Sequence, residues 1–162
     1  MKGVTQKKGF TLIEILVVIG LIAILAAIVL IAINPGRQFA QGRNSQRTSN
    51  VNAILNAVGQ NLADNKGVFA CGAAIPAAAT IIQKTGGYDI RACVSPTYIP
   101  EIPTDPSTGT NTCTTATCAG AGESYDTNYT IQKDATTQRV TVCAPGGVEA
   151  AIPGSAAICV TR

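Results

Sequence analysis

The stretch that decides the fold lies at residues 9–33, which read GFTLIEILVVIGLIAILAAIVLIAI. A single carboxylate, Glu14, stands in a run that is otherwise apolar from Phe10 to Ile33. As a helix, these residues would be about 36 Å long, enough to cross a hydrocarbon core of about 30 Å. The sequence therefore predicts one membrane-spanning helix over residues 10–33.

Glu14 needs a partner, because an ionised carboxylate inside the hydrocarbon costs about 2.5–3.5 kcal/mol. Cleavage between Gly9 and Phe10 would create a positive α-amino group four residues from Glu14, at the spacing of neighbours on a helix face. Within one subunit this pair would be strained, whereas between two helices staggered by about one turn it would neutralise both charges. Glu14 is therefore predicted to set the register of an assembly.

Gly9-Phe10-Thr11-Leu12-Ile13-Glu14, followed by an Ile, Leu, Val, Ala and Gly run over residues 15–28, resembles the processing motif of type IV pilins and type II secretion pseudopilins. The resemblance covers about the first 25 residues. It implies cleavage after Gly9 by a prepilin peptidase, N-methylation of Phe10 and an assembly role for Glu14. The alternative is an ordinary signal peptide or a plain membrane anchor with a chance glutamate, but the cleavage site of a signal peptide would follow the apolar region.

Residues 1–9, which cleavage would remove, form a basic leader. The charges leave the orientation of the helix in the membrane open, because the leader lysines (Lys2, Lys7 and Lys8) are balanced by Arg37, Arg43 and Arg47 beyond the span. The resemblance and the cysteines place the leader in the cytoplasm, with a single-pass anchor in the inner membrane and an extracytoplasmic head. A cell-surface or periplasmic filament would follow. Without the leader the side chains carry no net charge, so a nucleic-acid surface is not indicated. The arginines are interpreted as a solvated helix face, with lipid head groups or a neighbour's acidic groups as alternatives.

A second, amphipathic helical section is predicted over residues 34–66. Asn34-Pro35-Gly36 should interrupt or bend the helix, and Gly67 can adopt the left-handed conformation that ends one. Beyond the bend, an apolar stripe should lie on a small head, with polar residues opposite. The stripe comprises Phe39, Val51, Ile54, Leu55, Val58 and Leu62, and the polar side Asn52, Asn56, Gln60 and Asn61.

Residues 67–162 are predicted to form a globular head, and the whole chain an α+β fold: a long N-terminal helix packed on a small antiparallel sheet. Strands are expected at residues 129–132, 139–143 and 157–161, with a weaker one at 89–94. All six cysteines fall in this part and the chain has no histidine, so disulfides are favoured over a metal site. They allow many pairings. The preferred set joins neighbours: Cys71 with Cys93, Cys113 with Cys118, and Cys143 with Cys159.

The proline-rich segment 98–106 should be an extended loop, and it is similar to a loop of pseudopilins and related pilins. Because some of those proteins bind calcium nearby, Asp105, Glu123, Asp126 and Asn128 are candidate ligands. They lack a regular ligand spacing, so a solvated turn is favoured and no cofactor or metal is expected. Asn128-Tyr129-Thr130 fits a glycosylation acceptor, a pattern common by chance.

Nothing in the sequence indicates an enzyme or a small-molecule substrate: it has no histidine base, nucleophile elbow or phosphate loop. The chain is interpreted as a pilin-like structural subunit that polymerises through its first helix, for adhesion, motility or DNA uptake. Its expected partners are the peptidase and methyltransferase, membrane lipid, copies of itself and other pilins, and an inner-membrane assembly platform. A secretion pseudopilin and a membrane-anchored binding domain are the alternatives.

Overall fold

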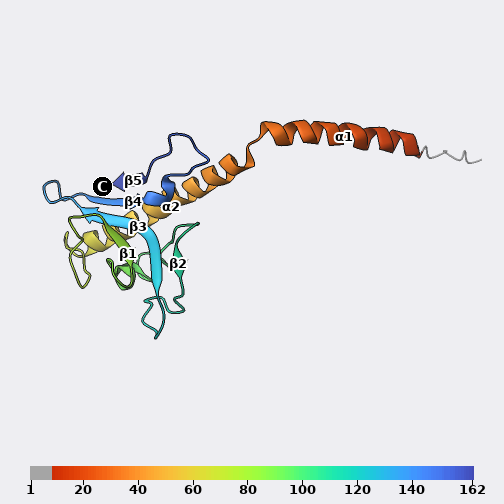
Figure 1. Ribbon diagram of the computed structural model, residues 1–162. Coiled ribbons are helices and arrows are strands. Elements are labelled where there is room, and N and C mark those ends of the chain that lie inside the picture. Colours follow the sequence, from red (N-terminus) through yellow and green to blue (C-terminus); the bar gives the residue numbers. More distant parts are fainter. Residues whose placement is uncertain (1–8) are drawn as a thin grey trace, which may run out of the picture. The chain divides into compact units, whose positions relative to one another are not determined.

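The computed structural model describes residues 9–162, so the leader lysines lie outside the described residues. The chain divides into two compact units, residues 1–36 and 37–162, which we describe separately. The first contains helix α1 (Leu12–Ala32). The second contains nearly all of helix α2 (Pro35–Asp64), the short helix α3 (Arg91–Val94) and a five-stranded sheet (Figure 1).

Helix α1 begins where Thr11 caps it: the Thr11 hydroxyl oxygen accepts a hydrogen bond from the Glu14 backbone N–H at 3.2 Å. Threonine is a favoured residue at this position because its side chain satisfies an amide that has no partner in the helix. The side chains over residues 12–30 are all exposed within the structure. The helix thus presents an apolar surface on every side.

Ile33 and Asn34 interrupt the helical path, and Ile33 has extended backbone dihedrals (φ −92°, ψ 120°). Pro35 is the first residue of α2, a position that tolerates proline because no helical partner is available for its missing N–H. The interruption predicted at Asn34-Pro35-Gly36 therefore takes the form of a two-residue break.

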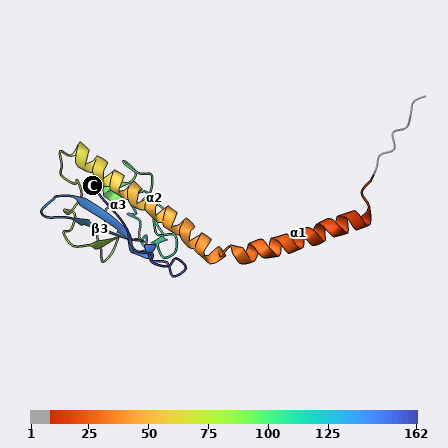
Figure 2. The same cartoon turned by 90° about the horizontal axis from the view of Figure 1, so that it is seen from above.

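Helix α2 lies along the sheet of its unit and supplies the centre of the core (Figure 2). Val51, Ile54 and Val58 are fully buried, as the predicted stripe requires. The prediction is wrong for one residue of the apolar stripe and for one residue of the polar side. Phe39 is 70% exposed, because it lies beyond the apolar core. Asn61 is buried, because its amide accepts a hydrogen bond from the Ala70 N–H in the loop that follows the helix and donates one to the Cys93 carbonyl.

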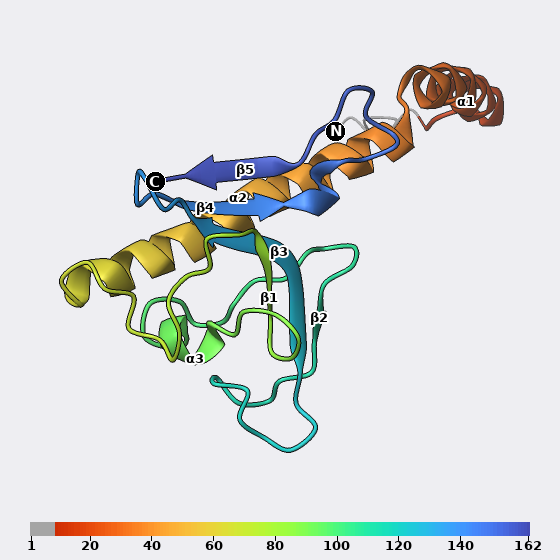
Figure 3. The ribbon, with the colours of Figure 1, turned by 60° about the vertical axis from the view of Figure 1, so that its left-hand side comes forward.

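The sheet is antiparallel, with the order β1-β3-β4-β5 and β2 paired to β3 (Figure 3). Alternate residues of β3 are buried (Tyr125, Thr127, Tyr129 and Ile131), which gives the sheet one apolar face for α2. The predicted α+β fold is confirmed. The strands are β1 (Thr80–Gln83), β2 (Thr110–Asn111), β3 (Tyr125–Lys133), β4 (Val140–Ala144) and β5 (Ile158–Thr161).

The strand predicted at residues 89–94 is wrong, because this segment contains helix α3. Its amides bond locally, as in Val94 N–H to Ile90 O at 3.2 Å, and no ladder partner is formed. Gly67 does adopt the left-handed conformation expected after α2, with φ +86° and its N–H bonded to Leu62 O at 2.7 Å.

Candidate functional site

The candidate processing segment precedes the first turn of α1. Gly9 and Phe10 lie outside regular secondary structure, and the Phe10 side chain is 80% exposed. A peptide bond in exposed backbone outside regular secondary structure is accessible to a protease. The geometry therefore suits cleavage between Gly9 and Phe10, which remains a prediction.

Glu14 lies in the first turn of α1, where the helix dipole favours a negative charge. Within residues 9–162, no cation forms an ion pair with its carboxylate. All the neighbouring apolar side chains of the helix are exposed as well. Among residues 9–162, Glu14 is thus an acidic group on an apolar helix without an ion-pair partner. Its assembly role remains a prediction.

Helix α1 is long and apolar enough to cross a membrane once, over residues 12–30 with a mean hydropathy of 3.1. It is the one such helix in the described part of the chain. A helix of this length and composition suits membrane anchoring.

In the second unit, a cluster of four charged side chains joins α2 to two loops of the head. We call it the ionic anchor: Arg43, Arg47, Asp105 and Glu149. Arg47 donates to both carboxylate oxygens of Asp105, Nε to Oδ2 at 2.6 Å and Nη2 to Oδ1 at 3.1 Å. Arg47 also donates one hydrogen bond to Glu149. Arg43 makes a bidentate contact to the same carboxylate, with distances of 2.6 and 2.7 Å. Two arginines of α2 thus hold two carboxylates from separate loops.

The central pair of the ionic anchor, Arg47 and Asp105, is buried. The side chain of Arg47 is 3% exposed and that of Asp105 is fully buried. Gly146 makes room for this contact, since a Cβ there would lie 2.8 Å from Asp105 Oδ2 and 3.1 Å from Arg47 Nε. Charges removed from water in this way need close, hydrogen-bonded partners. The three segments are therefore held together by the pairing.

The pairing also shifts the acidity of the carboxylates. Burial acts to raise the pKa of Asp105, but hydrogen bonds from Arg47, Ser107 and Thr108 outweigh it and hold that pKa below its ordinary value. The hydrogen bonds from Arg43 and then Arg47 lower the pKa of Glu149 to about 2. Both groups are thus charged in the folded protein across the neutral range.

The ionic anchor corrects two sequence interpretations. Arg43 and Arg47 are not a solvated face, and Asp105 is not a solvated turn, because they pair across the α2 interface. The spacing of Arg43 and Arg47 was an available signal, since residues four apart lie on one helix face. Their acidic partners lie 58 to 106 residues further along the chain, a separation that local spacing cannot reveal.

A further buried arginine was also missed. Arg91 is 2% exposed, lies 5.7 Å from the centre of the Tyr125 ring and donates to the Ala116 carbonyl at 2.8 Å. It also forms an ion pair with Glu101 at 3.2 Å. These contacts tie α3 to the loops around the Cys113–Cys118 disulfide, so Arg91 serves the architecture of the head.

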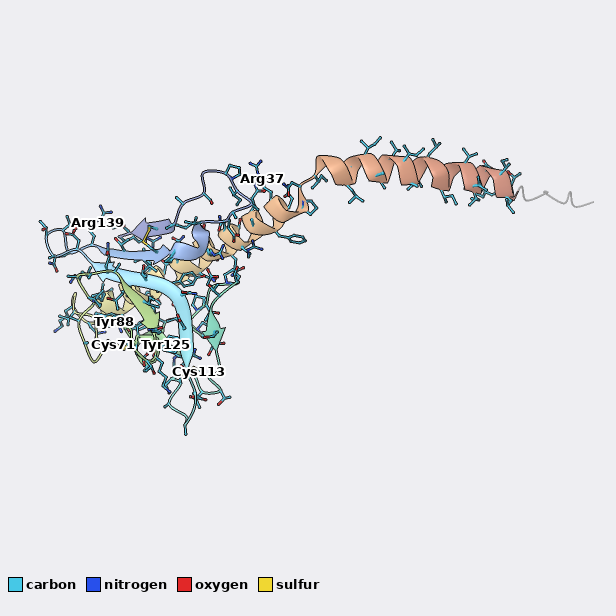
Figure 4. The ribbon with its side chains drawn as sticks, in the orientation of Figure 1. Arg37, Cys71, Tyr88, Cys113, Tyr125 and Arg139 are labelled. Carbon is cyan, nitrogen blue, oxygen red and sulfur yellow. A yellow bond between two sulfur atoms is a disulfide. The ribbon has the colours of Figure 1, made fainter. Side chains whose placement is uncertain are left out.

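Three disulfides link the cysteines: Cys71–Cys93, Cys113–Cys118 and Cys143–Cys159 (Figure 4). This is the pairing of neighbours preferred from the sequence. Cys143 and Cys159 lie opposite each other on β4 and β5. The β4–β5 connection that carries Glu149 is therefore closed covalently at its base.

The candidate calcium ligands are not assembled into one site. The Asp105 carboxylate is paired with Arg47. The Glu123 carboxylate accepts hydrogen bonds from the backbone N–H groups of Thr114 (2.6 Å) and Gly120 (2.8 Å). Asp126 accepts from the Asn128 N–H at 2.8 Å, within β3. In the described part of the chain, no group of three His, Cys, Asp or Glu side chains is arranged to hold a metal. Their oxygens instead stabilise turns and the ionic anchor.

Comparison with known proteins locates the family signal at the N-terminus. A protein-family model described as the prokaryotic N-terminal methylation motif matches residues 5–30. This range contains Gly9, Phe10, Glu14 and most of α1. The chain matches no curated protein and no solved structure. Together with the exposed apolar helix that it covers, the matched motif supports recognising the chain as a type IV pilin-like or pseudopilin precursor.

Proposed function

We propose that the chain is a structural subunit of a type IV pilus-like filament, processed between Gly9 and Phe10 and assembled through α1. The observation that carries this proposal is an apolar helix with every described side chain exposed, which begins with a methylation motif and bears one carboxylate that has no ion-pair partner among residues 9–162. Such a surface is stable in lipid or against other apolar helices, but not in water. Membrane anchoring followed by helix bundling accounts for both environments.

Glu14 has a specific role in this proposal. After cleavage, the Phe10 amine of one subunit would lie opposite the Glu14 carboxylate of a neighbour, and the two charges would neutralise each other in a dry bundle. A buried charge is tolerated when it is paired. The pair would favour one stagger between helices and disfavour the others, which leave Glu14 unpaired.

N-terminal sequencing and intact mass of the protein from membranes and from a sheared surface fraction test the processing step. A chain that begins at methylated Phe10 and occurs in the sheared fraction supports the filament. A chain that begins at Met1, or is cut after the apolar run, contradicts it. A pseudopilin would instead give a processed chain whose deletion abolishes protein secretion and leaves surface filaments intact.

Variants of Glu14 test the assembly step. Glu14→Ala and Glu14→Gln should be processed and anchored normally but lost from filaments, because each removes the charge. Glu14→Asp keeps the charge and is the matched control, expected to retain part of the incorporation. Equal incorporation of Glu14→Ala and the wild type would overturn the role of this residue.

A further inference from the structure

A hollow of about 340 Å³ lies where the chain leaves α2, in the second unit. We call it the loop hollow. Its volume falls in the range of small-ligand sites, about 300–1,000 Å³. The loop after α2 forms most of the wall, and the end of β3 contributes one residue. The lining residues are Gly67, Val68, Phe69, Cys71, Gly72, Ala73, Ala74, Ile75 and Lys133.

The wall of the loop hollow is held in place without a ligand. The Cys71–Cys93 disulfide ties it to α3. Asn61 of α2 accepts from the Ala70 N–H at 2.8 Å, and the Tyr88 hydroxyl donates to the Ala73 carbonyl at 2.6 Å. Figure 4 labels Cys71 and Tyr88 in this part of the head. A preformed wall lowers the entropic cost of binding.

The lining combines apolar surface with one charge. Phe69 and Ile75 are each only 7% exposed, so they fix the lining to the hydrophobic core. The glycines and alanines of the lining have small side chains that leave the hollow open. Lys133 is the charged residue of the lining, and its backbone N–H is fixed to the Pro76 carbonyl at 2.8 Å. The lining of the hollow therefore combines an apolar wall with one lysine.

Lys133 lacks a counter-ion in the described part of the chain: no carboxylate of residues 9–162 lies within 4.0 Å of its ammonium. The adjacent acid, Asp134, is engaged in the β3–β4 turn, where it accepts from the N–H groups of Thr136 (2.9 Å) and Thr137 (2.6 Å). An ammonium beside a partly dry, apolar wall attracts an anion more strongly than one in bulk water.

We propose that the loop hollow binds a carboxylate carried on a short apolar stem, with Lys133 pairing the carboxylate and the wall around Phe69 and Ile75 covering the stem. The carboxylate can belong to a free small acid or to the C-terminus of another polypeptide. This binding is independent of α1 and of filament assembly.

The test is an NMR titration of the full chain in lipid nanodiscs with N-acetyl-leucine, compared with N-acetyl-leucinamide, which has the same stem but no charge. We expect saturable amide shifts over residues 67–75 and at Lys133, with affinity for the acid at least about tenfold higher than for the amide, a factor that corresponds to about 1.4 kcal/mol. A peptide ending in leucine distinguishes the sources: tighter binding than N-acetyl-leucine points to a polypeptide C-terminus, and equal binding to a free acid.

Lys133→Gln should abolish the preference for the acid while leaving the fold unchanged. Arg139→Gln is the matched control, because it removes the same charge from an exposed position on the adjoining turn and should bind like the wild type. Equal affinity of the wild type for acid and amide, an undiminished preference for the acid in Lys133→Gln, or no saturable shift at millimolar acid would each overturn the proposal.

Discussion

The two long helices of this chain differ in where they find their partners. Helix α1 has 21 residues and an apolar surface on every side, none of it buried over residues 12–30. Helix α2 has 30 residues and buries one face against its own sheet, with polar residues opposite. The difference teaches that the unit with α2 is complete as a fold, whereas α1 requires lipid or other helices.

Helix α2 is itself anchored in two ways along its length. Its N-terminal half is held by polar contacts, mainly the ionic anchor and the hydrogen bond from Asn50 to the Tyr129 hydroxyl at 2.9 Å. Its C-terminal half is held by apolar packing around Ile54 and Val58. Charge pairing thus positions the part of α2 that lies nearer to α1 in sequence, and hydrophobic burial positions the rest.

The largest expected effect comes from breaking the ionic anchor. Arg47→Ala leaves Asp105 buried and unpaired, which should lower the free energy of unfolding by about 3–5 kcal/mol. Chemical denaturation of the full chain in detergent, followed by near-UV circular dichroism of the head tyrosines, measures this loss. Arg139→Ala, on an exposed turn, is the control and should change it by less than about 0.5 kcal/mol. An equally small change in Arg47→Ala would show that the ionic anchor does not stabilise the head.

A matched pair of isoleucines tests the contrast between the helices directly. Ile54→Ala opens a cavity in the core beneath α2 and should cost about 2–5 kcal/mol in the same assay. Ile22→Ala removes the same atoms from exposed α1 and should leave unfolding of the head unchanged. A comparable loss in both variants would mean that α1 packs on the head.

Acid should loosen the N-terminal half of α2 with a smaller, graded effect. The folded-state pKa of Glu149 is lowered from 4.5 to about 2, so its contribution to stability is present above about pH 4.5. That contribution is lost as the pH falls toward 2, because protonation removes the charge that Arg43 and Arg47 bind. Glu149→Gln should flatten this part of the stability profile between pH 5 and 2, since it cannot titrate. An unchanged acid profile in that variant would contradict the assignment to Glu149.

Much of the fold could be predicted because local sequence patterns indicate the helices and several of the strands. The apolar run before Ile33 marked α1, and the alternation around Tyr129 and Ile131 marked the central strand. The segment 89–94 was misjudged because its apolar residues suit a short strand or a short helix equally well, and contacts outside the segment decide between them. β1 and the first half of β3 were not predicted, because each is stabilised by pairing with a distant partner.

The candidate site divides in the same way. Gly9, Phe10 and Glu14 could be predicted from the sequence because a processing motif is read locally, on a continuous stretch of chain, and their roles remain predictions. The ionic anchor and the loop hollow were not predicted, since they join residues up to 106 positions apart in the first case and two separate segments in the second.

The sequence by itself determined the apolar helix that is long enough to cross a membrane, the single carboxylate at its start and the composition of the head, because hydrophobicity and local spacing act over neighbouring residues. Only the tertiary structure decided which charges are solvated and which are buried. Arg47 and Asp105 would both be exposed on isolated segments, and each is buried only because folding brings the other within hydrogen-bonding distance.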